Sequence, residues 1–378
     1  MVYDVVVCGG GIAGVSAALA ASRNNAKVLL VEREYALGGL ATLGLIAIYL
    51  PLCDGKGFKM SSGISEELLK LSLKYGIGKI PEAWKKESSL EERTKKRYQV
   101  EFNPASFTIA MEEKLLKSGV KILYGCHISG AKTNNNEIKY ITIETKTGKQ
   151  KIYGKTFIDT TGDADICYFS GEQTIEDNTN RKTGWYFSYD ETELKLNMLS
   201  DPLYSEVSNE SRMYSGTNMD DVSQICIDGR KMILEDVLRK RKTNEKVYPV
   251  LIPAFHGLRM TRRFKGDFEF SADNHENKFF EDAIGMIGNW RKKGLRYSLP
   301  LRIIVGNKNN NLYIAGRCVS TDKSGWDVTR VIPSCAVTGE AAGTIAAYQS
   351  INERKPTIKE LQEILTKNGV LLDEKLFK

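Results

Sequence analysis

Short apolar runs and small-residue segments alternate at the start of the chain. Val5–Cys8 is a β-branched run typical of a strand buried in a parallel sheet. Ile12–Ser22 consists almost entirely of small and aliphatic residues, so a buried helix is expected. Ala26–Glu32 is a second apolar run that ends in glutamate. This pattern predicts a strand, a helix and a second parallel strand.

A capped helix and another strand follow later in the chain. Asn103 is a suitable N-cap, Pro104 suits the first helical position, and Gly119 suits the C-terminal end. The run 120–128 then predicts a strand that joins the parallel sheet. Residues 137–159 alternate like an antiparallel meander with a Lys-Thr-Gly turn and end in an apolar strand.

The pattern is interrupted near residue 175 and resumes near residue 300. Residues 311–315 predict a strand and 333–350 a small-residue helix, whereas the middle of the chain is polar and irregular apart from a helix expected at 230–242. The predicted fold class is α/β, with a three-layer Rossmann-like domain that contains a β-meander and an inserted α+β substrate domain. The expected boundaries are 1–175 and 300–350 for the discontinuous nucleotide-binding domain, 176–299 for the substrate domain, and 351–378 for a C-terminal helical tail.

Three glycines between the first predicted strand and helix have the spacing of a dinucleotide-binding turn. Gly9 permits the tight turn, Gly11 lets a pyrophosphate approach the backbone, and Gly14 lets the helix pack on the strand. The N-terminus of the helix, at Ile12, then points at the anion. Glu32, at the end of the second strand, can accept hydrogen bonds from both ribose hydroxyls.

A second glycine pair distinguishes between the two common dinucleotides. Gly38 and Gly39 follow Glu32 closely, where an NAD domain would normally enter its next helix. FAD proteins have such a turn because their ribityl chain and isoalloxazine extend past it. The pattern therefore favours FAD.

The overall composition is that of an ordinary globular protein, with 42% hydrophobic and 27% charged residues. A net charge of +7 is mild for 378 residues and does not favour nucleic acid as a partner. Seven scattered cysteines without a CxxC pair indicate reduced thiols in a cytoplasmic protein, with no metal cluster. The N-terminus has no signal-peptide pattern and no run reaches membrane-spanning length, so no membrane association is expected.

The combined motifs resemble the FAD-dependent oxidoreductase family. They are GGGIAG at 9–14, DTTGDAD at 159–165, AGRCVS at 315–320 and WDVTRVIPSCAVTGEAAGT at 326–344. This family is related to the succinate dehydrogenase and fumarate reductase flavoproteins and has a glutathione-reductase-like fold. Fumarate reductase relatives often tether FAD through an early histidine, whereas the first histidine here is His127, so the resemblance implies non-covalent FAD. It implies cofactor binding by Gly9, Gly11, Ile12, Ala13, Gly14, Glu32, Arg33, Gly39, Ala41, Ile128, Gly162, Asp165, Gly316 and Arg330.

The segment 255–270 supplies the candidate catalytic residues. Read as a strand, it places His256 and Arg262 on one face with apolar side chains, and Arg259 and Arg263 on the other. A buried guanidinium is costly unless paired, and its fork geometry suits a carboxylate or phosphate. The catalytic candidates are therefore His256, Arg259 and Arg262. The alternative is that Arg262 pairs with an internal acid and His256 fills the core.

These features predict an oxidoreductase that transfers a hydride between a small organic substrate, with anions favoured, and flavin N5. An external electron acceptor or donor would complete the cycle. The chain has no second GxGxxG motif that could bind NAD(P)H. It also lacks the cysteine pair that a disulfide reductase carries just after this position, since no cysteine lies between Glu32 and Pro51. Two alternatives stay open: a tRNA-modifying flavoprotein, supported by the charge and the basic run 239–242, and a non-catalytic flavin-binding partner protein.

Overall fold

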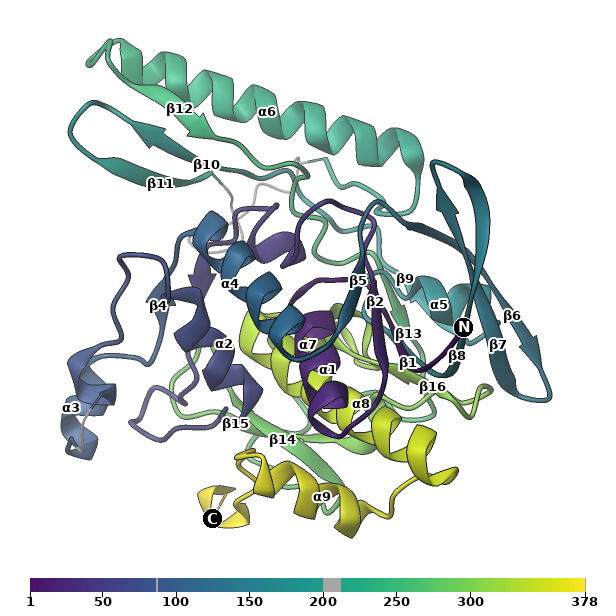
Figure 1. Ribbon diagram of the computed structural model, residues 1–378. Helices are drawn as coiled ribbons and strands as arrows, with labels where there is room; N and C mark the ends of the chain where they lie inside the picture. Colours follow the sequence, from purple (N-terminus) through teal and green to yellow (C-terminus); the bar gives the residue numbers. More distant parts are fainter. Residues whose placement is uncertain (86–87, 200–211, 378) are drawn as a thin grey trace. The chain divides into compact units, whose positions relative to one another are not determined.

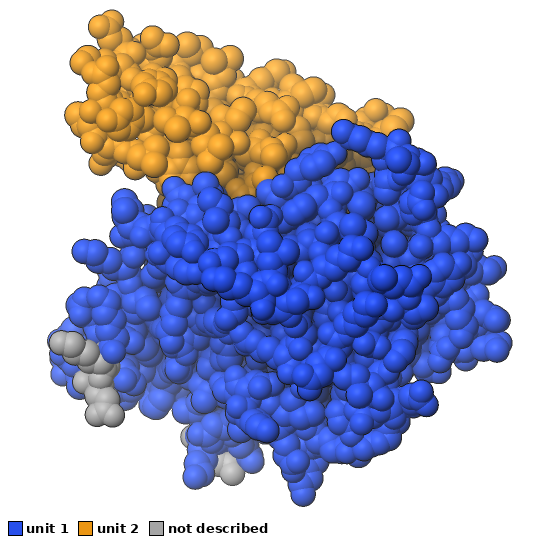
Figure 2. Space-filling model, viewed as in Figure 1, with its two compact units in different colours: residues 1–38, 47–175, 263–378 blue, residues 39–46, 176–262 orange. Residues whose placement is uncertain are grey.

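The structure is a computed structural model that describes residues 1–85, 88–199 and 212–377. The chain divides into two compact units, which Figure 2 colours separately. Unit 1 comprises residues 1–38, 47–175 and 263–378, and unit 2 comprises residues 39–46 and 176–262.

The division differs from the expected boundaries at the return point. Unit 1 resumes at residue 263 and not near residue 300. The reason is an antiparallel pair, β14 (Ala283–Gly288) and β15 (Arg296–Pro300), which belongs to unit 1. Gly285 of β14 lies so close to Val337 that a Cβ atom on the glycine would be 2.2 Å from the valine side chain. The C-terminal residues also belong to unit 1, because α9 (Ile358–Lys367) buries one face of its helix there.

A mixed sheet forms the centre of unit 1 (Figure 1). Its order is β5-β2-β1-β8-β7-β6, and β16 also pairs with β8. The pairs of β1 with β2 and β8, of β2 with β5, and of β8 with β16 are parallel, whereas β6, β7 and β8 form the predicted antiparallel meander. The strands are β1 (Val2–Cys8), β2 (Val28–Val31), β5 (Lys121–Leu123), β6 (His127–Asn134), β7 (Glu137–Thr145), β8 (Gly148–Asp159) and β16 (Leu312–Ile314).

Strand β8 belongs to both parts of this sheet. Its first eight residues are exposed or half-buried, and the part from Gly148 to Tyr153 pairs antiparallel with β7, as in Tyr153 opposite Tyr140. Its last four residues are buried and pair in parallel with β1 on one side and β16 on the other. The change from exposed to continuously buried residues along one strand thus marks the passage from meander to parallel sheet.

The helices of unit 1 include two that pack unusually closely, α1 and α8. A Cβ atom on Gly339 would lie 2.3 Å from the carbonyl oxygen of Ala13, and one on Gly343 would lie 2.1 Å from that of Ala17. Ser16 donates a hydrogen bond of 2.6 Å from its Oγ to the carbonyl of Ala336. The helices are α1 (Ile12–Arg23), α2 (Ile64–Ser72), α3 (Leu90–Lys95), α4 (Pro104–Lys117), α5 (Asp165–Phe169), α7 (Lys323–Thr329) and α8 (Ile332–Asn352), together with α9.

The predicted caps of the helix after residue 103 are confirmed. The side chain of Asn103 accepts a hydrogen bond of 2.9 Å from the N–H of Ser106, and Pro104 opens α4. Gly119 follows the helix with a φ of 76°, which favours glycine. The remaining strands form two short pairs, β3 (Ile48–Tyr49) with β4 (Val100–Glu101) and β9 (Thr174–Glu176) with β13 (Arg262–Phe264).

Unit 2 is built from a small sheet and one long helix. The sheet has the order β11-β10-β12, with β10 (Gly184–Tyr189), β11 (Leu194–Leu199) and β12 (Tyr248–Leu251). The helix expected at 230–242 is the second half of α6 (Met219–Arg241), which packs on β10. Its Ile233 and Val237 form a buried cluster with Tyr186, whose hydroxyl donates a 2.7 Å hydrogen bond to Asp236.

The strand predicted over 255–270 is wrong for most of its length. Strand geometry is limited to β13, and residues 256–261 form an irregular segment. The side chain of Asn180 accepts hydrogen bonds from the N–H groups of Arg259 and Met260, at 2.8 and 2.9 Å. A side-chain amide therefore takes the place of a neighbouring strand along this segment.

A buried carboxyl group on α8 caps α2. Helix α2 begins after Gly63, which provides no side-chain cap, and the N–H of Ile64 instead donates to Oε2 of Glu340 at 2.8 Å. Gly63 has a φ of 62°, and a Cβ atom there would lie 2.5 Å from the same oxygen. Burial raises the pKa of Glu340 to about 8, although the N–H of Ile64 opposes the shift.

This arrangement predicts the effect of Glu340→Gln, which keeps an acceptor oxygen but removes the titration. The folded protein holds the Glu340 proton more tightly than the unfolded chain, because the pKa rises from 4.5 to about 8 on folding. The resulting stabilisation is complete below the unfolded pKa and is lost as the pH rises through about 8. From about pH 5 to pH 9, the wild type should lose on the order of a few kcal/mol more unfolding free energy than the variant.

Urea unfolding at both pH values measures this difference. Glu363→Gln, which changes an exposed glutamate on α9, is the matched control and should follow the wild type. Equal pH dependence in the wild type and Glu340→Gln would show that Glu340 is not a linked group.

Candidate dinucleotide-binding site

The turn between β1 and α1 is held together by contacts that exclude side chains at two of its glycines. Gly9 has a φ of 111°, and a Cβ atom there would be 2.5 Å from the carbonyl oxygen of Thr160. A Cβ atom on Gly14 would be 1.8 Å from the carbonyl oxygen of Gly9. At Gly11, by contrast, a Cβ atom would meet nothing within 4 Å. Packing therefore requires Gly9 and Gly14, whereas Gly11 leaves space beside the turn.

The N-terminus of α1 faces this space without a cap. Gly11 is the N-cap residue and supplies no side chain, and the first helical turn contains no acidic residue. The first bond of the helix runs from the N–H of Val15 to the carbonyl of Gly11, so the preceding N–H groups have no acceptor within the helix. Open donors and the positive end of the helix dipole make this end suited to an anion.

Glu32 lies at the carboxyl end of β2 and supports the same turn. Its Oε2 accepts a hydrogen bond from the N–H of Gly10, and its Oε1 accepts one of 2.8 Å from the N–H of Glu34. Burial raises the pKa of Glu32, and the N–H donors of Glu34 and Gly10 oppose the shift. Each carboxylate oxygen has a second lone pair, so the group can still accept hydrogen bonds from ribose hydroxyls.

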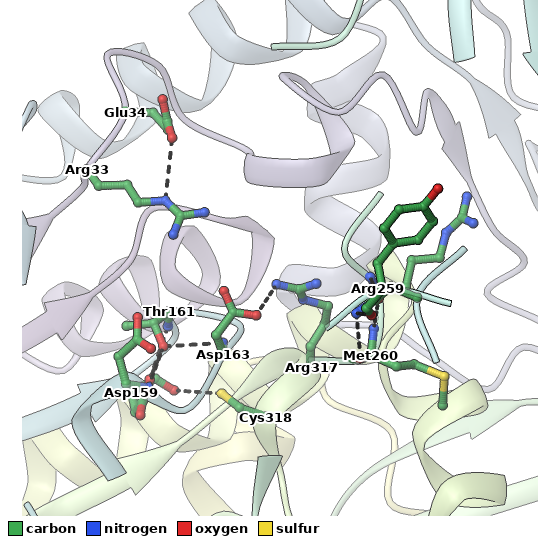
Figure 3. Close-up of polar contacts among 12 residues, drawn as sticks. Arg33, Glu34, Asp159, Thr161, Asp163, Arg259, Met260, Arg317 and Cys318 are labelled. Carbon is green, nitrogen blue, oxygen red and sulfur yellow. Dashed lines mark hydrogen bonds and ion pairs between the residues drawn. The ribbon is translucent and has the colours of Figure 1, made fainter. Parts of the chain in front are cut away.

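The two predicted adenosine-side residues near Glu32 have different environments. Ile128 is buried on β6, and this strand begins beside Glu32, whose carbonyl accepts a 3.1 Å hydrogen bond from the N–H of Cys126. The side chain of Arg33 is 42% exposed and forms an ion pair of 3.4 Å with Glu34 (Figure 3). Arg33 is therefore exposed at the turn, whereas Ile128 is buried.

Asp159, which sequence reasoning did not identify, organises the turn after β8. Its buried carboxylate accepts hydrogen bonds from the N–H and hydroxyl of Thr161, at 3.1 and 2.7 Å (Figure 3). It accepts another from the N–H of Cys167 at 3.0 Å. Burial raises the pKa of Asp159, and these donors oppose the shift. Gly162 follows with a φ of 83°, and the Thr161 hydroxyl accepts a hydrogen bond from the N–H of Asp165.

The turn after β16 reaches the start of α1. Gly316 has a φ of 82°, and a Cβ atom there would lie 2.9 Å from the Cβ of Ala13. Its N–H donates a 3.0 Å hydrogen bond to the hydroxyl of Thr338 on α8. Arg330, just before α8, forms an ion pair of 2.6 Å with Asp327. The turns after β8 and β16 therefore meet the glycine turn within unit 1.

Other predicted site residues belong to unit 2. Gly39 and Ala41 lie in a 3-10 turn (Gly39–Ala41), in which Gly39 has a φ of 55°. His256 is fully buried, and its Nδ1 is 2.5 Å from the carbonyl oxygen of Thr183. A Cβ atom on Gly229 of α6 would be 2.1 Å from that nitrogen. Burial lowers the pKa of His256, so the neutral ring is favoured.

Arg262 and Arg263, at the start of β13, are both buried and contact different residues. Arg262 is 7% exposed and lies 3.8 Å from Glu176, whereas Arg263 is also buried, at 6% exposed. The chain passes from unit 2 to unit 1 between these two residues. Arg263 lies over the ring of Trp326, 5.4 Å from its centroid, and Trp326 is completely buried. Both guanidinium groups are therefore buried, each within a different unit.

The residues of unit 1 fit a dinucleotide. They provide an uncapped helix N-terminus, a glycine with open space beside it, and a buried acid at the end of the adjacent strand. Within the described residues, no cluster of three or more histidine, cysteine or acidic side chains could hold a metal ion. In the same residues no helix is both long and apolar enough to cross a membrane. All seven cysteines are free thiols.

Solved structures of other proteins align with nearly the whole of this chain. Among solved structures, p-nitrophenol 4-monooxygenase from Pseudomonas putida aligns with a TM-score of 0.50 and 14% identity over 96% of this chain and 82% of its own. A geranylgeranyl bacteriochlorophyll reductase-like protein from Thermoplasma acidophilum aligns with a TM-score of 0.47 and 14% identity, over 97% and 83%. At these identities the first likeness shows the fold alone.

The family model described as "FAD dependent oxidoreductase" matches residues 4–185 and 172–365. The two matched ranges together reach from within β1 to within α9, so the match extends through nearly the whole chain. The chain therefore belongs to the FAD-dependent oxidoreductase family and is an oxidoreductase with FAD as its cofactor.

Proposed function

We propose that the enzyme transfers a hydride between a carbon atom of a small organic substrate and N5 of FAD. The bound flavin supplies the capacity to take up or release two electrons. The protein holds the cofactor, orients the substrate and stabilises its charge. An external electron acceptor or donor takes part, because each turnover has to restore the starting oxidation state.

The open N-terminus of α1 is the observation that carries the proposal. The N–H groups of Ile12 and Ala13 and the space beside Gly11 would hold the pyrophosphate, and Glu32 would accept hydrogen bonds from the adenosine ribose. The resemblance assigns the rest of the non-covalent FAD to Gly9, Gly14, Arg33, Gly39, Ala41, Ile128, Gly162, Asp165, Gly316 and Arg330.

Arg259 and Arg262 are the proposed substrate-binding residues of unit 2. A guanidinium group binds a carboxylate or phosphate through two parallel hydrogen bonds, which suits a small organic anion. The side chain of Asn180 fixes the backbone at Arg259. We do not propose proton transfer for His256, because its Nδ1 contacts the carbonyl oxygen of Thr183 and its ring is fully buried. We assign it to positioning the segment that ends at Arg262.

Gly11→Val tests the cofactor site. The valine side chain would occupy the space proposed for the pyrophosphate, yet it meets no protein atom within 4 Å at its Cβ, and the φ of −66° allows a β-branched residue. We expect a folded protein with a near-normal melting temperature and no bound FAD. The wild type should release intact FAD on acid precipitation, which is followed by absorbance and mass spectrometry.

Gly14→Ala is the matched comparison for this variant. Its Cβ would lie 1.8 Å from the carbonyl oxygen of Gly9, so the change should lower the free energy of unfolding by about 1–3 kcal/mol even without cofactor. Normal FAD content in Gly11→Val would show that the pyrophosphate does not bind at this end of α1.

Arg262→Lys tests the substrate site. A lysine retains the charge but cannot form the paired hydrogen bonds, so anaerobic flavin bleaching by organic acids should slow by about tenfold or more. FAD content should stay normal. Arg212→Lys is the control, because Arg212 is an exposed arginine of the same unit, paired with Asp221 at 2.8 Å. A library of organic acids, steroids and sugars, tested by bleaching in the absence of oxygen, identifies the substrate class.

A substrate deuterated at the reacting carbon checks the chemistry. Bleaching should show a primary isotope effect if a hydride leaves that carbon in the rate-limiting step.

Equal rates for Arg262→Lys and the wild type with every anionic substrate would exclude anion binding at Arg262.

A further inference from the structure

Helix α6 carries a row of exposed apolar side chains. Ile227, Leu234 and Leu238 are 46, 57 and 54% exposed. Their spacing of seven and four residues places them on one face of the helix, which we call the apolar row. The buried residues of α6 lie on the other side of the helix, which packs on β10 (Figure 1). The apolar row therefore faces away from the sheet of unit 2.

Close packing fixes the rotation of α6 about its own axis. A Cβ atom on Gly229 would lie 2.1 Å from Nδ1 of His256. One on Gly184 of β10 would lie 3.2 Å from the carbonyl oxygen of Gly229. A rotation that buried the apolar row would break these contacts and expose Ile233 and Val237, which are buried now. The apolar row is thus an exterior feature of unit 2.

Cationic side chains flank the apolar row on both sides. Arg230 and Arg241 lie eleven residues apart, about three helical turns, so they follow one edge of the row. Lys231 and Lys242 have the same spacing and follow the other edge. All four residues are exposed. Within the described residues, Arg230, Arg241 and Lys242 form no ion pair, and Lys231 lies 3.9 Å from Asp228.

The acidic residues of α6 leave much of this positive charge uncompensated. Asp220 is exposed in the first turn, before the apolar row begins, and Glu235 is exposed beside the lysine edge. The other three acids are engaged by groups outside the row: Asp221 by Arg212, Asp228 by the hydroxyl of Tyr214, and Asp236 by the hydroxyl of Tyr186. The outer face of α6 therefore combines an apolar centre with a net positive charge.

A second copy of the chain would not match this face. In a two-fold pair with parallel helices, every residue would oppose its own counterpart. In an antiparallel pair centred on the apolar row, Arg230 and Lys231 would lie near the axis and oppose theirs. Both arrangements bring like charges together, which is unfavourable. An anionic lipid surface has no such conflict, because apolar side chains enter the acyl boundary while arginine and lysine extend to the headgroups.

We propose that this face of α6 binds the surface of an anionic lipid bilayer. The apolar row enters the boundary of the acyl chains, and the four flanking cations lie at the lipid phosphates. Three apolar side chains and four cations suit reversible binding rather than permanent anchoring. The helix lies in the plane of the surface, so no spanning run is needed. Surface binding thus revises the expectation of no membrane association, which considered spanning runs.

Vesicle sedimentation tests the proposal on the full chain with FAD bound. Vesicles of equal parts phosphatidylcholine and phosphatidylglycerol are compared with vesicles of phosphatidylcholine alone. The wild type should bind the anionic vesicles at low salt and much less at high salt, because salt screens the attraction. Leu234→Gln should weaken binding by about tenfold, since an inserted side chain is lost. The double variant Arg230→Gln/Arg241→Gln should weaken it by about thirtyfold.

Each variant has a matched control in unit 1. Leu116→Gln on α4 is the control for Leu234→Gln, because both leucines are 57% exposed on a helix. Lys146→Gln/Lys149→Gln removes the same net charge as the arginine variant, from exposed lysines at the turn between β7 and β8. Both controls should bind vesicles like the wild type. All variants should keep the wild-type melting temperature and FAD content, because the altered side chains are exposed.

Failure of the wild type to bind anionic vesicles overturns the proposal. So does binding that Leu234→Gln and the arginine variant leave unchanged, or that the controls weaken equally, because another face or net charge alone would then be responsible. Light scattering without lipid detects a second copy as the occupant. A dimer that Leu234→Gln dissociates would assign this face to self-association and overturn the lipid proposal.

Discussion

Unit 1 depends on the contact between α1 and α8. The two helices approach closely enough that Gly339 and Gly343 of α8 lie directly against backbone carbonyls of α1. Side chains at these positions would separate the helices, and the start of α1 would move away from Gly316 and the turn after β16. The geometry that suits a diphosphate thus follows from backbone packing between two segments more than three hundred residues apart.

Buried carboxyl groups in this unit serve the backbone. Glu32 holds the glycine turn, Asp159 holds the turn after β8, and Glu340 caps α2. Each accepts hydrogen bonds from N–H groups that would otherwise lack an acceptor. The three acids therefore fix two turns and the start of α2 through hydrogen bonds to the backbone.

The parallel sheet and its glycine turn could be predicted from sequence because their signals are local. Val5–Cys8, the glycines at 9–14 and Glu32 specify strand, turn and acid within one continuous stretch. The irregular segment before β13 could not be predicted, because its N–H groups bind Asn180, which lies about eighty residues away in sequence. The alternating apolar residues of the segment 255–270 follow the pattern of a strand, and a strand was therefore predicted there. The same limit applies to the ion pair between Arg317 and Asp163, which lie about 150 residues apart in sequence.

The burial of α1 has a consequence for biosynthesis. This helix has ten buried residues and is synthesised more than three hundred residues before its partner α8, which begins at Ile332. A nascent chain therefore carries an apolar helix without its packing surface until α8 leaves the ribosome. Such exposure favours aggregation and chaperone engagement during synthesis. Chains interrupted before α8 would lack the native packing surface for α1, so the unit cannot complete its core before α8 is synthesised.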